Sequence, residues 1–229
     1  HDPVRMRRLL ESVARNVAGE ATLERLAADV SADGGAFDSK TARTYPGWEP
    51  DPDAQITVTC GATEGMMASI LGTIDPGDEV IIPAPYWASF PDIVALAGGV
   101  PVIAQTGIAQ AFKMSAAQLE QAITPRTRML ILNSPSNPTG AIYSRDELAG
   151  LGEVLARHPQ VLIVSDDMYE HILFDDRPFV NILNACPELY GQTVIMNAVS
   201  KTYAMTGWRI GFAAGPEDVV AAMVNVQSQ

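Results

Sequence analysis

The stretch TVIMNAVSKTYAMTGWRIGFAA, residues 193–214, organises the rest of the chain. Its two apolar runs, Thr193–Met196 and Ile210–Ala214, are typical of buried strands, and Lys201 lies between them. An isolated buried ammonium is costly, and the same desolvation activates a lysine as an amine able to form a Schiff base. Arg209 follows eight residues later, and its planar fork suits a phosphate. An interfacial lysine with a snorkelling stem explains this stretch equally well on its own.

The composition limits the kinds of protein the chain can be. Its 229 residues are 47% hydrophobic and 18% charged, which is ordinary for one large globular domain or two small ones. The net charge of −12 argues against a nucleic-acid or anionic-membrane partner. No apolar run approaches the roughly 18 residues of a membrane span, and no signal-peptide pattern is present. We therefore expect a cytoplasmic protein, with a start that is trimmed or incomplete because the first residue is His1.

Cysteine and histidine usage indicates neither a disulfide framework nor a metal centre. Cys60 and Cys186 are far apart and lie in apolar settings, which predicts buried free thiols in a reducing compartment. The three scattered histidines show no metal-ligand spacing, so we expect no metal site.

From Ile56 onward, short apolar runs alternate with helical patterns. Strands are predicted at Ile56–Cys60, Glu79–Pro83, Val100–Gln105, Met129–Asn133, Val161–Asp166, Thr193–Asn197 and Arg209–Ala214. Helices are predicted at Thr63–Gly72, Trp87–Ala97, Ala116–Ile123, Ser144–Arg157 and from Pro216, and capping boxes begin two of them, at Ser115 and at Ser144. Strands that are apolar throughout and separated by helices predict a three-layer α/β/α fold with a mostly parallel sheet.

The first fifty residues differ in character. Residues 4–30 carry leucines and valines at helical spacing and predict a helix, whereas residues 31–55 are rich in glycine, proline and aspartate and predict a loop. The expected organisation is a helical and loop segment over residues 1–50, followed by an α/β domain over residues 51–229.

Ligands of such sheets bind beyond the carboxyl ends of the strands, so the residues there are the candidates for a site. Gly61, Ala62 and Thr63 open a helix whose N-terminus suits a phosphate, although a turn that merely needs glycine is the commoner explanation. Tyr86 and Trp87 offer a flat face for a conjugated ring, and ordinary core aromatics fit equally well.

Two further strand ends carry polar side chains. The segment Asn133–Gly140 is a rigid turn whose asparagines, including Asn137, can donate to an oxygen, or it is purely structural. Asp166 closes an apolar strand and needs a cationic partner, either a protonated pyridine nitrogen or a structural arginine. Tyr169, three residues on, can point its phenol into the same crevice.

The order of these signals closely resembles the fold-type I pyridoxal-phosphate aminotransferases of class I/II. It runs Gly-Ala-Thr, Pro-Tyr-Trp, Asn-Pro-Thr-Gly, Asp-x-x-Tyr and Ser-Lys with an arginine eight residues on. The most specific phrases are Asn133–Gly140 and Ala204–Gly211, and the similarity extends from Ile56 to the end of the chain. The bacterial aspartate aminotransferase branch is the most similar.

The resemblance implies a cofactor, pyridoxal 5'-phosphate, and a role for each matched residue. Lys201 is implied to form the internal aldimine and to move the α-proton, and Asp166 to keep the pyridine nitrogen protonated. Asn137 and Tyr169 are implied to hydrogen-bond the ring's phenolic oxygen. The remaining implied cofactor contacts are Trp87 stacked on the ring, and Gly61, Ala62, Thr63, Ser200 and Arg209 around the phosphate. The implied reaction is transamination between an L-amino acid and a 2-oxo acid by a homodimer.

The chain departs from the family pattern in ways that leave the substrate open. Ala62 and Thr63 replace a Gly-Lys pair whose lysine favours acidic substrates in the aspartate branch, so aromatic or other neutral amino acids remain candidates. Family members are nearly twice as long, and we expect the C-terminal small domain with its carboxylate-binding arginine to be absent. The alternatives are another reaction of the same cofactor, such as that of a β-lyase or synthase, an incomplete non-catalytic fragment that binds the cofactor, and a ligand sensor fused to a DNA-binding domain.

Overall fold

The computed structural model describes residues 50–175 and 177–229. The helix predicted over residues 4–30, and almost all of the segment predicted over residues 1–50, lie outside the described residues.

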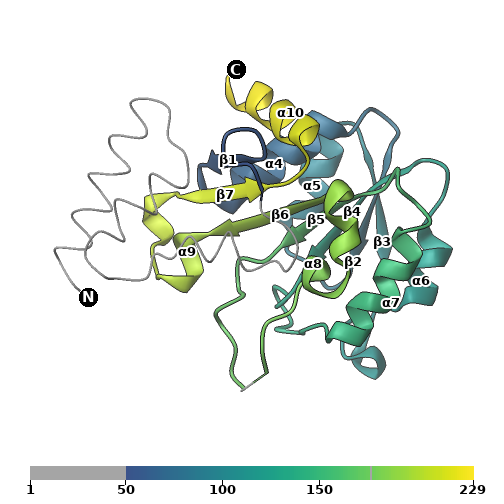
Figure 1. The fold of residues 1–229 in the computed structure, drawn as a ribbon. Coiled ribbons are helices and arrows are strands. Elements are labelled where there is room, and N and C mark those ends of the chain that lie inside the picture. The colour runs from purple at the N-terminus through teal and green to yellow at the C-terminus, as the bar shows by residue number, and fades with distance from the viewer. Residues whose placement is uncertain (1–49, 176) are drawn as a thin grey trace.

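A seven-stranded sheet forms the middle of the domain, in the order β1-β7-β6-β5-β4-β2-β3 (Figure 1). The strands are β1 (Ile56–Thr59), β2 (Glu79–Pro83), β3 (Val100–Ala104), β4 (Thr127–Asn133), β5 (Leu162–Asp166), β6 (Thr193–Ala198) and β7 (Gly211–Ala214). The pairs from β6 through β5, β4 and β2 to β3 are parallel, whereas β7 runs antiparallel to both β6 and β1. The mostly parallel sheet predicted from the apolar runs is therefore confirmed.

Helices connect the strands and cover the sheet. The α-helices are α4 (Gly61–Thr73), α5 (Ser89–Leu96), α6 (Ala116–Ala122), α7 (Arg145–Leu155), α8 (Ile182–Ala185), α9 (Val199–Thr202) and α10 (Glu217–Gln227). Short 3-10 helices lie at η1 (Ile108–Gln110), η2 (Pro187–Gln192) and η3 (Thr206–Trp208). The capping boxes predicted at Ser115 and Ser144 are both present, each with its hydroxyl accepting from the backbone three residues on.

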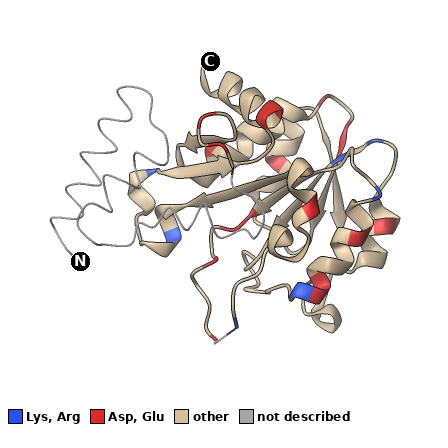
Figure 2. Cartoon of the chain, in the orientation of Figure 1, with Lys and Arg blue, Asp and Glu red and all other residues tan. Residues whose placement is uncertain are grey.

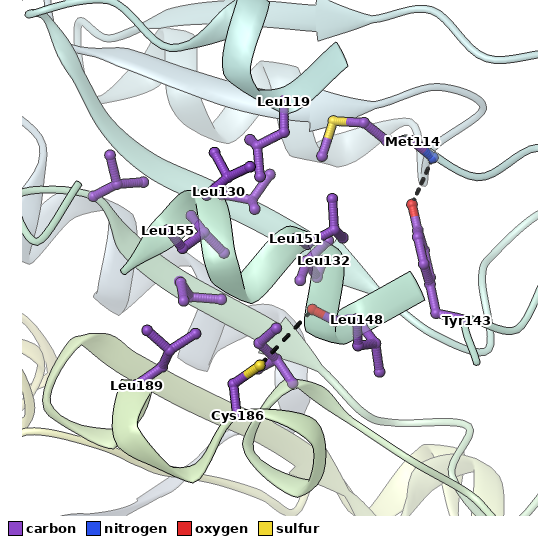
Figure 3. Packing of buried hydrophobic residues seen from close by; sticks show 14 of the residues in the cluster. Met114, Leu119, Leu130, Leu132, Tyr143, Leu148, Leu151, Leu155, Cys186 and Leu189 are labelled. Carbon is purple, nitrogen blue, oxygen red and sulfur yellow. Dashed lines mark hydrogen bonds between the residues drawn. The ribbon is translucent and has the colours of Figure 1, made fainter. Parts of the chain in front are cut away.

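Successive residues of each strand face different helical layers, because side chains alternate across a strand. One layer packs α6, α7 and α8 against strand residues such as Leu130 and Ile163, and Figure 3 shows this cluster around Leu151. The other layer packs α4, α5 and α10 against residues such as Met129 and Val164. Burial on both faces explains why the strands are apolar throughout, and it confirms the three-layer α/β/α fold.

Three details differ from the prediction. β7 begins at Gly211 rather than Arg209, because η3 and the left-handed backbone of Arg209 (φ 54°) precede the strand. α4 begins at Gly61, two residues earlier than predicted. Cys60 is exposed rather than buried, because it lies between the end of β1 and the start of α4, whereas Cys186 is buried, and both are free.

The amino end of the sheet is held by a buried acid. Both oxygens of the Glu79 carboxylate accept hydrogen bonds, one from Thr124 Oγ1 at 2.5 Å and the other from Arg126 Nε at 3.0 Å. These donors, Thr124 foremost, hold the pKa of Glu79 below its usual value despite the opposing effect of burial. The acid therefore links the start of β2 to the loop that precedes β4.

Candidate functional site

A cavity of about 180 Å³ opens at the carboxyl ends of the strands. It is lined by Ala62, Thr63, Met66, Trp87, Phe90, Asn137, Asp166, Met168, Tyr169, Ser200, Lys201, Thr206 and Arg209. Every residue that the resemblance assigns to the cofactor except Gly61 lines this cavity, and Gly61 directly precedes the lining residue Ala62. Tyr86, the other aromatic candidate, does not line it. Chain topology thus brings together side chains from the ends of five strands, as the predicted arrangement of the sheet requires.

One end of the cavity is suited to an anion. α4 begins there, and the first N–H groups of a helix have no partner within the helix. Gly61 has φ +74°, and the Arg209 guanidinium occupies the space in which a Cβ at Gly61 would lie, with Cζ 2.9 Å from that position. Arg209 is itself anchored, since Nη1 donates to the carbonyl oxygen of Thr206 at 3.2 Å and Nη2 to that of Cys60 at 3.4 Å. Helix dipole and guanidinium therefore converge on the same place.

Asp166 supplies a carboxyl group to the lining of the cavity. It is the last residue of β5 and only 8% exposed. Its Oδ1 accepts a hydrogen bond from the backbone N–H of Met168 at 3.3 Å, and burial raises the pKa of the carboxyl to about 6. Among residues 50–175 and 177–229, no lysine, arginine or histidine forms an ion pair with it. The carboxylate is therefore placed to accept a cation that enters the cavity.

Asn137 and Tyr169 both line the cavity, and their side chains lie near enough for the Asn137 amide to act on the pKa of Tyr169. Asn133 positions the Asn137 turn, since its Oδ1 accepts from Asn137 N at 2.7 Å and its Nδ2 donates to the Asp166 carbonyl at 3.0 Å. Burial raises the pKa of Tyr169, and the charge of Asp166 raises it further, whereas the Asn137 side chain acts to lower it. Asn137, Tyr169 and Asp166 thus bring polar groups to the lining of the same cavity.

Lys201 lies on α9 and is exposed, so the burial expected from its position between two apolar runs is wrong. β6 ends at Ala198, and α9 carries the lysine out of the sheet before β7 begins. Its Nζ lies 5.9 Å from the centroid of the Tyr169 ring. The amine therefore borders the cavity without being enclosed in the core.

The aromatic wall of the cavity is Trp87 with Phe90. Their rings meet edge to face, with centroids 5.4 Å apart and an interplanar angle of 89°. Sequence reasoning found Trp87 but missed Phe90, as well as the lining residues Met66, Met168 and Thr206. For Phe90 a signal existed, since it lies three residues after Trp87 in the segment predicted as helix.

A second buried acid lies beneath the cavity and was not predicted as part of the site. Asp167 accepts hydrogen bonds from Ser165 Oγ at 2.6 Å and from Asn181 Nδ2 at 2.5 Å. Burial raises the pKa of Asp167 to about 8. This acid connects the end of β5 to the N-cap of α8, and so it supports the strand end that carries Asp166.

The family model described as "Aminotransferase class I and II" matches residues 35–229. The chain belongs to the aminotransferase class I and II family. The predicted resemblance is thereby confirmed. The aspartate/prephenate aminotransferase of Nitrosomonas europaea is 59% identical over 175 residues, which make up 76% of this chain and 44% of that protein. The corresponding protein of Cereibacter sphaeroides is 57% identical over 176 residues, again 44% of its length.

Solved structures of the family share the fold. The aspartate aminotransferase from Rhizobium meliloti superposes with a TM-score of 0.86 at 40% identity, over 100% of this chain and 56% of that one. An aromatic aminotransferase from Pyrococcus horikoshii superposes with a TM-score of 0.84 at 29% identity, over 99% of this chain and 59% of that one. The chain thus spans less than half the length of these curated relatives and a little over half of these structural neighbours.

Charge and hydropathy add two observations about the surface. Acidic segments are spread over several helices and loops in Figure 2, in keeping with the net charge of −12. No helix within the described ranges is both long and apolar enough to cross a membrane.

Proposed function

We propose that this chain carries the pyridoxal 5'-phosphate site of an aminotransferase that moves an amino group between an L-amino acid and a 2-oxo acid. The observation that supports this most is the convergence on one cavity of Asp166, from the end of β5, with Lys201 and Arg209, from the segment between β6 and β7. When bound, the cofactor supplies a carbonyl group that receives the amino group and an electron-withdrawing ring that eases removal of the substrate's α-proton.

The residues around the cavity fit the cofactor's groups. The helix N-terminus at Ala62 and Thr63, the buried Ser200 and the Arg209 guanidinium suit a phosphate. Asp166 lacks an ion-pair partner among the described residues and suits a protonated ring nitrogen. A cation beside Asp166 lowers its pKa, so the carboxylate and the ring nitrogen each stabilise the other's charge.

The other side chains orient the ring and the proton. The Asn137–Tyr169 pair is placed to hydrogen-bond the ring's phenolic oxygen, and Trp87 offers an aromatic face. Lys201 Nζ is assigned two tasks: it would hold the cofactor, and it would carry a proton at the substrate's α-carbon. An exposed position on a short helix leaves this side chain free to move between those tasks.

The wider assignment rests on the relatives. Residues 51–229 are proposed as the cofactor-binding domain, acting in the cytoplasm as part of a homodimer. Because relatives are named aspartate/prephenate aminotransferases, L-aspartate is the first amino donor to test, with prephenate and small 2-oxo acids as acceptors. Ala62 and Thr63 in place of the Gly-Lys pair make an aromatic amino acid the second donor to test.

The test combines cofactor binding with turnover. The chain should bind pyridoxal phosphate with a visible absorption band, and release of more than one equivalent of 2-oxo acid from the donor should occur only while an acceptor is supplied. Lys201→Ala should abolish the band, whereas Lys113→Ala, which removes a lysine paired with Glu147 on α7, should keep it. Ammonia release without an acceptor would favour a lyase, and absence of any band in the unmodified chain would contradict the cofactor assignment.

A further inference from the structure

Thr59, the last residue of β1, lies just outside the residues that line the cavity and is only 3% exposed. Its hydroxyl Oγ1 donates a hydrogen bond to the carbonyl oxygen of Gly61, 3.0 Å away. A buried hydroxyl bound to the turn two residues ahead holds that turn in one orientation.

The direction of this bond matters for the cavity. Every cis peptide bond among the described residues precedes a proline, so the Gly61–Ala62 peptide is trans. In a planar trans peptide the C=O and the N–H point in opposite directions. Thr59 holds the Gly61 carbonyl, so the N–H of Ala62 points away from the Thr59 hydroxyl, and Ala62 itself lines the cavity.

Gly211 fixes the same peptide from the neighbouring strand. In the sheet register it lies opposite Thr59 of β1 on one side and opposite Ala198 of β6 on the other. A Cβ at this position would lie 2.7 Å from the carbonyl carbon of Gly61, 2.8 Å from Thr59 Oγ1 and 2.9 Å from Ala62 N. Two of these three contacts are with backbone, so a methyl group would displace the peptide itself.

We propose that Thr59 and Gly211 are positioning residues that together aim the Ala62 N–H at the phosphate of the cofactor. This inference rests on the proposed function, because it assigns the anion to pyridoxal phosphate. Thr59 supplies the hydrogen bond that orients the peptide, and Gly211 supplies the space that the oriented peptide needs. Neither residue touches the cofactor, so their effect should be confined to the phosphate's contribution to binding.

The test compares two probes that differ only in the phosphate. Dissociation constants of pyridoxal phosphate and of pyridoxal are measured by absorbance, and their ratio isolates the phosphate. In Thr59→Val, which keeps shape but loses the hydroxyl, the dissociation constant of pyridoxal phosphate should rise about tenfold, the usual value of a hydrogen bond to a charged group. Pyridoxal binding should change by less than about twofold, and Thr59→Ser should restore the ratio.

Two control variants separate this effect from a loss of stability. Thr57→Val removes a hydroxyl on the same strand that donates to Gln227 Oε1 at 2.9 Å, away from the cavity. Gly215 follows β7 at the end opposite Gly211, and Gly215→Ala creates a comparable clash. The added Cβ would lie 2.8 Å from Val194 Cγ2 and 3.2 Å from the Thr193 carbonyl oxygen. Both should lower the unfolding midpoint and leave the ratio of dissociation constants unchanged. Gly211→Ala should raise the ratio of the pyridoxal phosphate constant to the pyridoxal constant, as Thr59→Val does.

The outcomes distinguish this inference from the proposed function. An unchanged ratio in Thr59→Val, with the unmodified chain binding pyridoxal phosphate normally, overturns the positioning role alone. Should Gly211→Ala fail to fold, the Thr59 series still decides. If the unmodified chain binds pyridoxal and pyridoxal phosphate equally or not at all, the phosphate site itself is wrong and both proposals fail.

Discussion

Glu79 and Asp166 are buried carboxylates at opposite ends of one sheet, and their surroundings differ in kind. Glu79 begins β2 and accepts hydrogen bonds from Thr124 and Arg126, which keep its pKa below the usual value. Asp166 ends β5 and accepts one 3.3 Å bond from a backbone N–H, and burial raises its pKa to about 6. The first acid has its partners within the domain, whereas the second has no ion-pair partner among residues 50–175 and 177–229.

The comparison teaches how to separate a structural acid from a functional one. Burying a carboxylate costs free energy unless donors compensate it, so a buried acid with few donors is a candidate for a functional role. At the amino end of the sheet, hydrogen-bond donors compensate the charge of Glu79. At the carboxyl end, Asp166 has little such compensation, and it lines the same cavity as the exposed Lys201 and the Arg209 guanidinium at the N-terminus of α4.

The largest difference should appear in activity. Asp166→Asn should lower the transamination rate about hundredfold, because an amide cannot stabilise a cationic ring nitrogen as a carboxylate does. Glu79→Gln should change the rate by less than about twofold, since it lies at the far end of the sheet. Rates are measured at saturating pyridoxal phosphate, and equal losses in the two variants would contradict the distinction.

Stability should respond in the opposite order. Glu79→Gln should lower the free energy of unfolding by about 2 kcal/mol, because it weakens hydrogen bonds to a charged group and leaves Arg126 without its ion pair. Asp166→Asn should raise it by about 1 kcal/mol at pH 7 in the cofactor-free chain, because a poorly compensated charge is removed. Urea unfolding of both variants checks this, and destabilisation by Asp166→Asn would count against the argument.

The pH dependence of stability should carry opposite signs. The pKa of Asp166 is higher in the folded chain, about 6, than its usual 3.8, so its contribution lowers the free energy of unfolding as pH rises from about 4 to 6. The pKa of Glu79 is lower than its usual 4.5, so its contribution is lost as pH falls below that value. The free energy of unfolding is measured against pH for the unmodified chain, for Asp166→Asn and for Glu79→Gln. Subtracting each variant's profile from that of the unmodified chain isolates the contribution of each acid, and slopes of the same sign would contradict this prediction.

The smallest effect concerns the foremost donor to Glu79. Thr124→Val should lower the free energy of unfolding by about 1 kcal/mol, because it removes one hydrogen bond to the carboxylate. It should also raise the pKa of Glu79 toward its usual value, which moves the acid-side loss of stability to higher pH. If the loss of stability at low pH occurs at the same pH in Thr124→Val, Arg126 alone compensates the charge of Glu79.

The sequence predicted the fold and the positions of most site residues because those depend on local pattern. Apolar runs and capping boxes locate strands and helices, and parallel strands bring their ends to one edge. Asp166 was therefore predictable as an acid closing a strand. The surroundings of Glu79 were not, because Thr124 and Arg126 come more than forty residues later and only the folded register brings them together.

Other differences have equally physical causes. The exposure of Lys201 was missed because an apolar run does not reveal that the strand ends at Ala198 and a helical turn follows. Thr59 and Gly211 were missed because their contact joins two strands that are distant in the sequence and antiparallel in the sheet. Local pattern identifies the residues at the site, whereas their burial and mutual support emerge only from packing.

The central claim, that this cavity holds pyridoxal phosphate through Lys201, has one direct test. The chain is loaded with the cofactor, reduced with borohydride, digested and analysed by mass spectrometry. We predict that the pyridoxyl phosphate group is recovered on the peptide that contains Lys201, and that Lys113 is unlabelled. A label on another lysine, or no label on a chain that has been shown to be folded, would contradict the assignment.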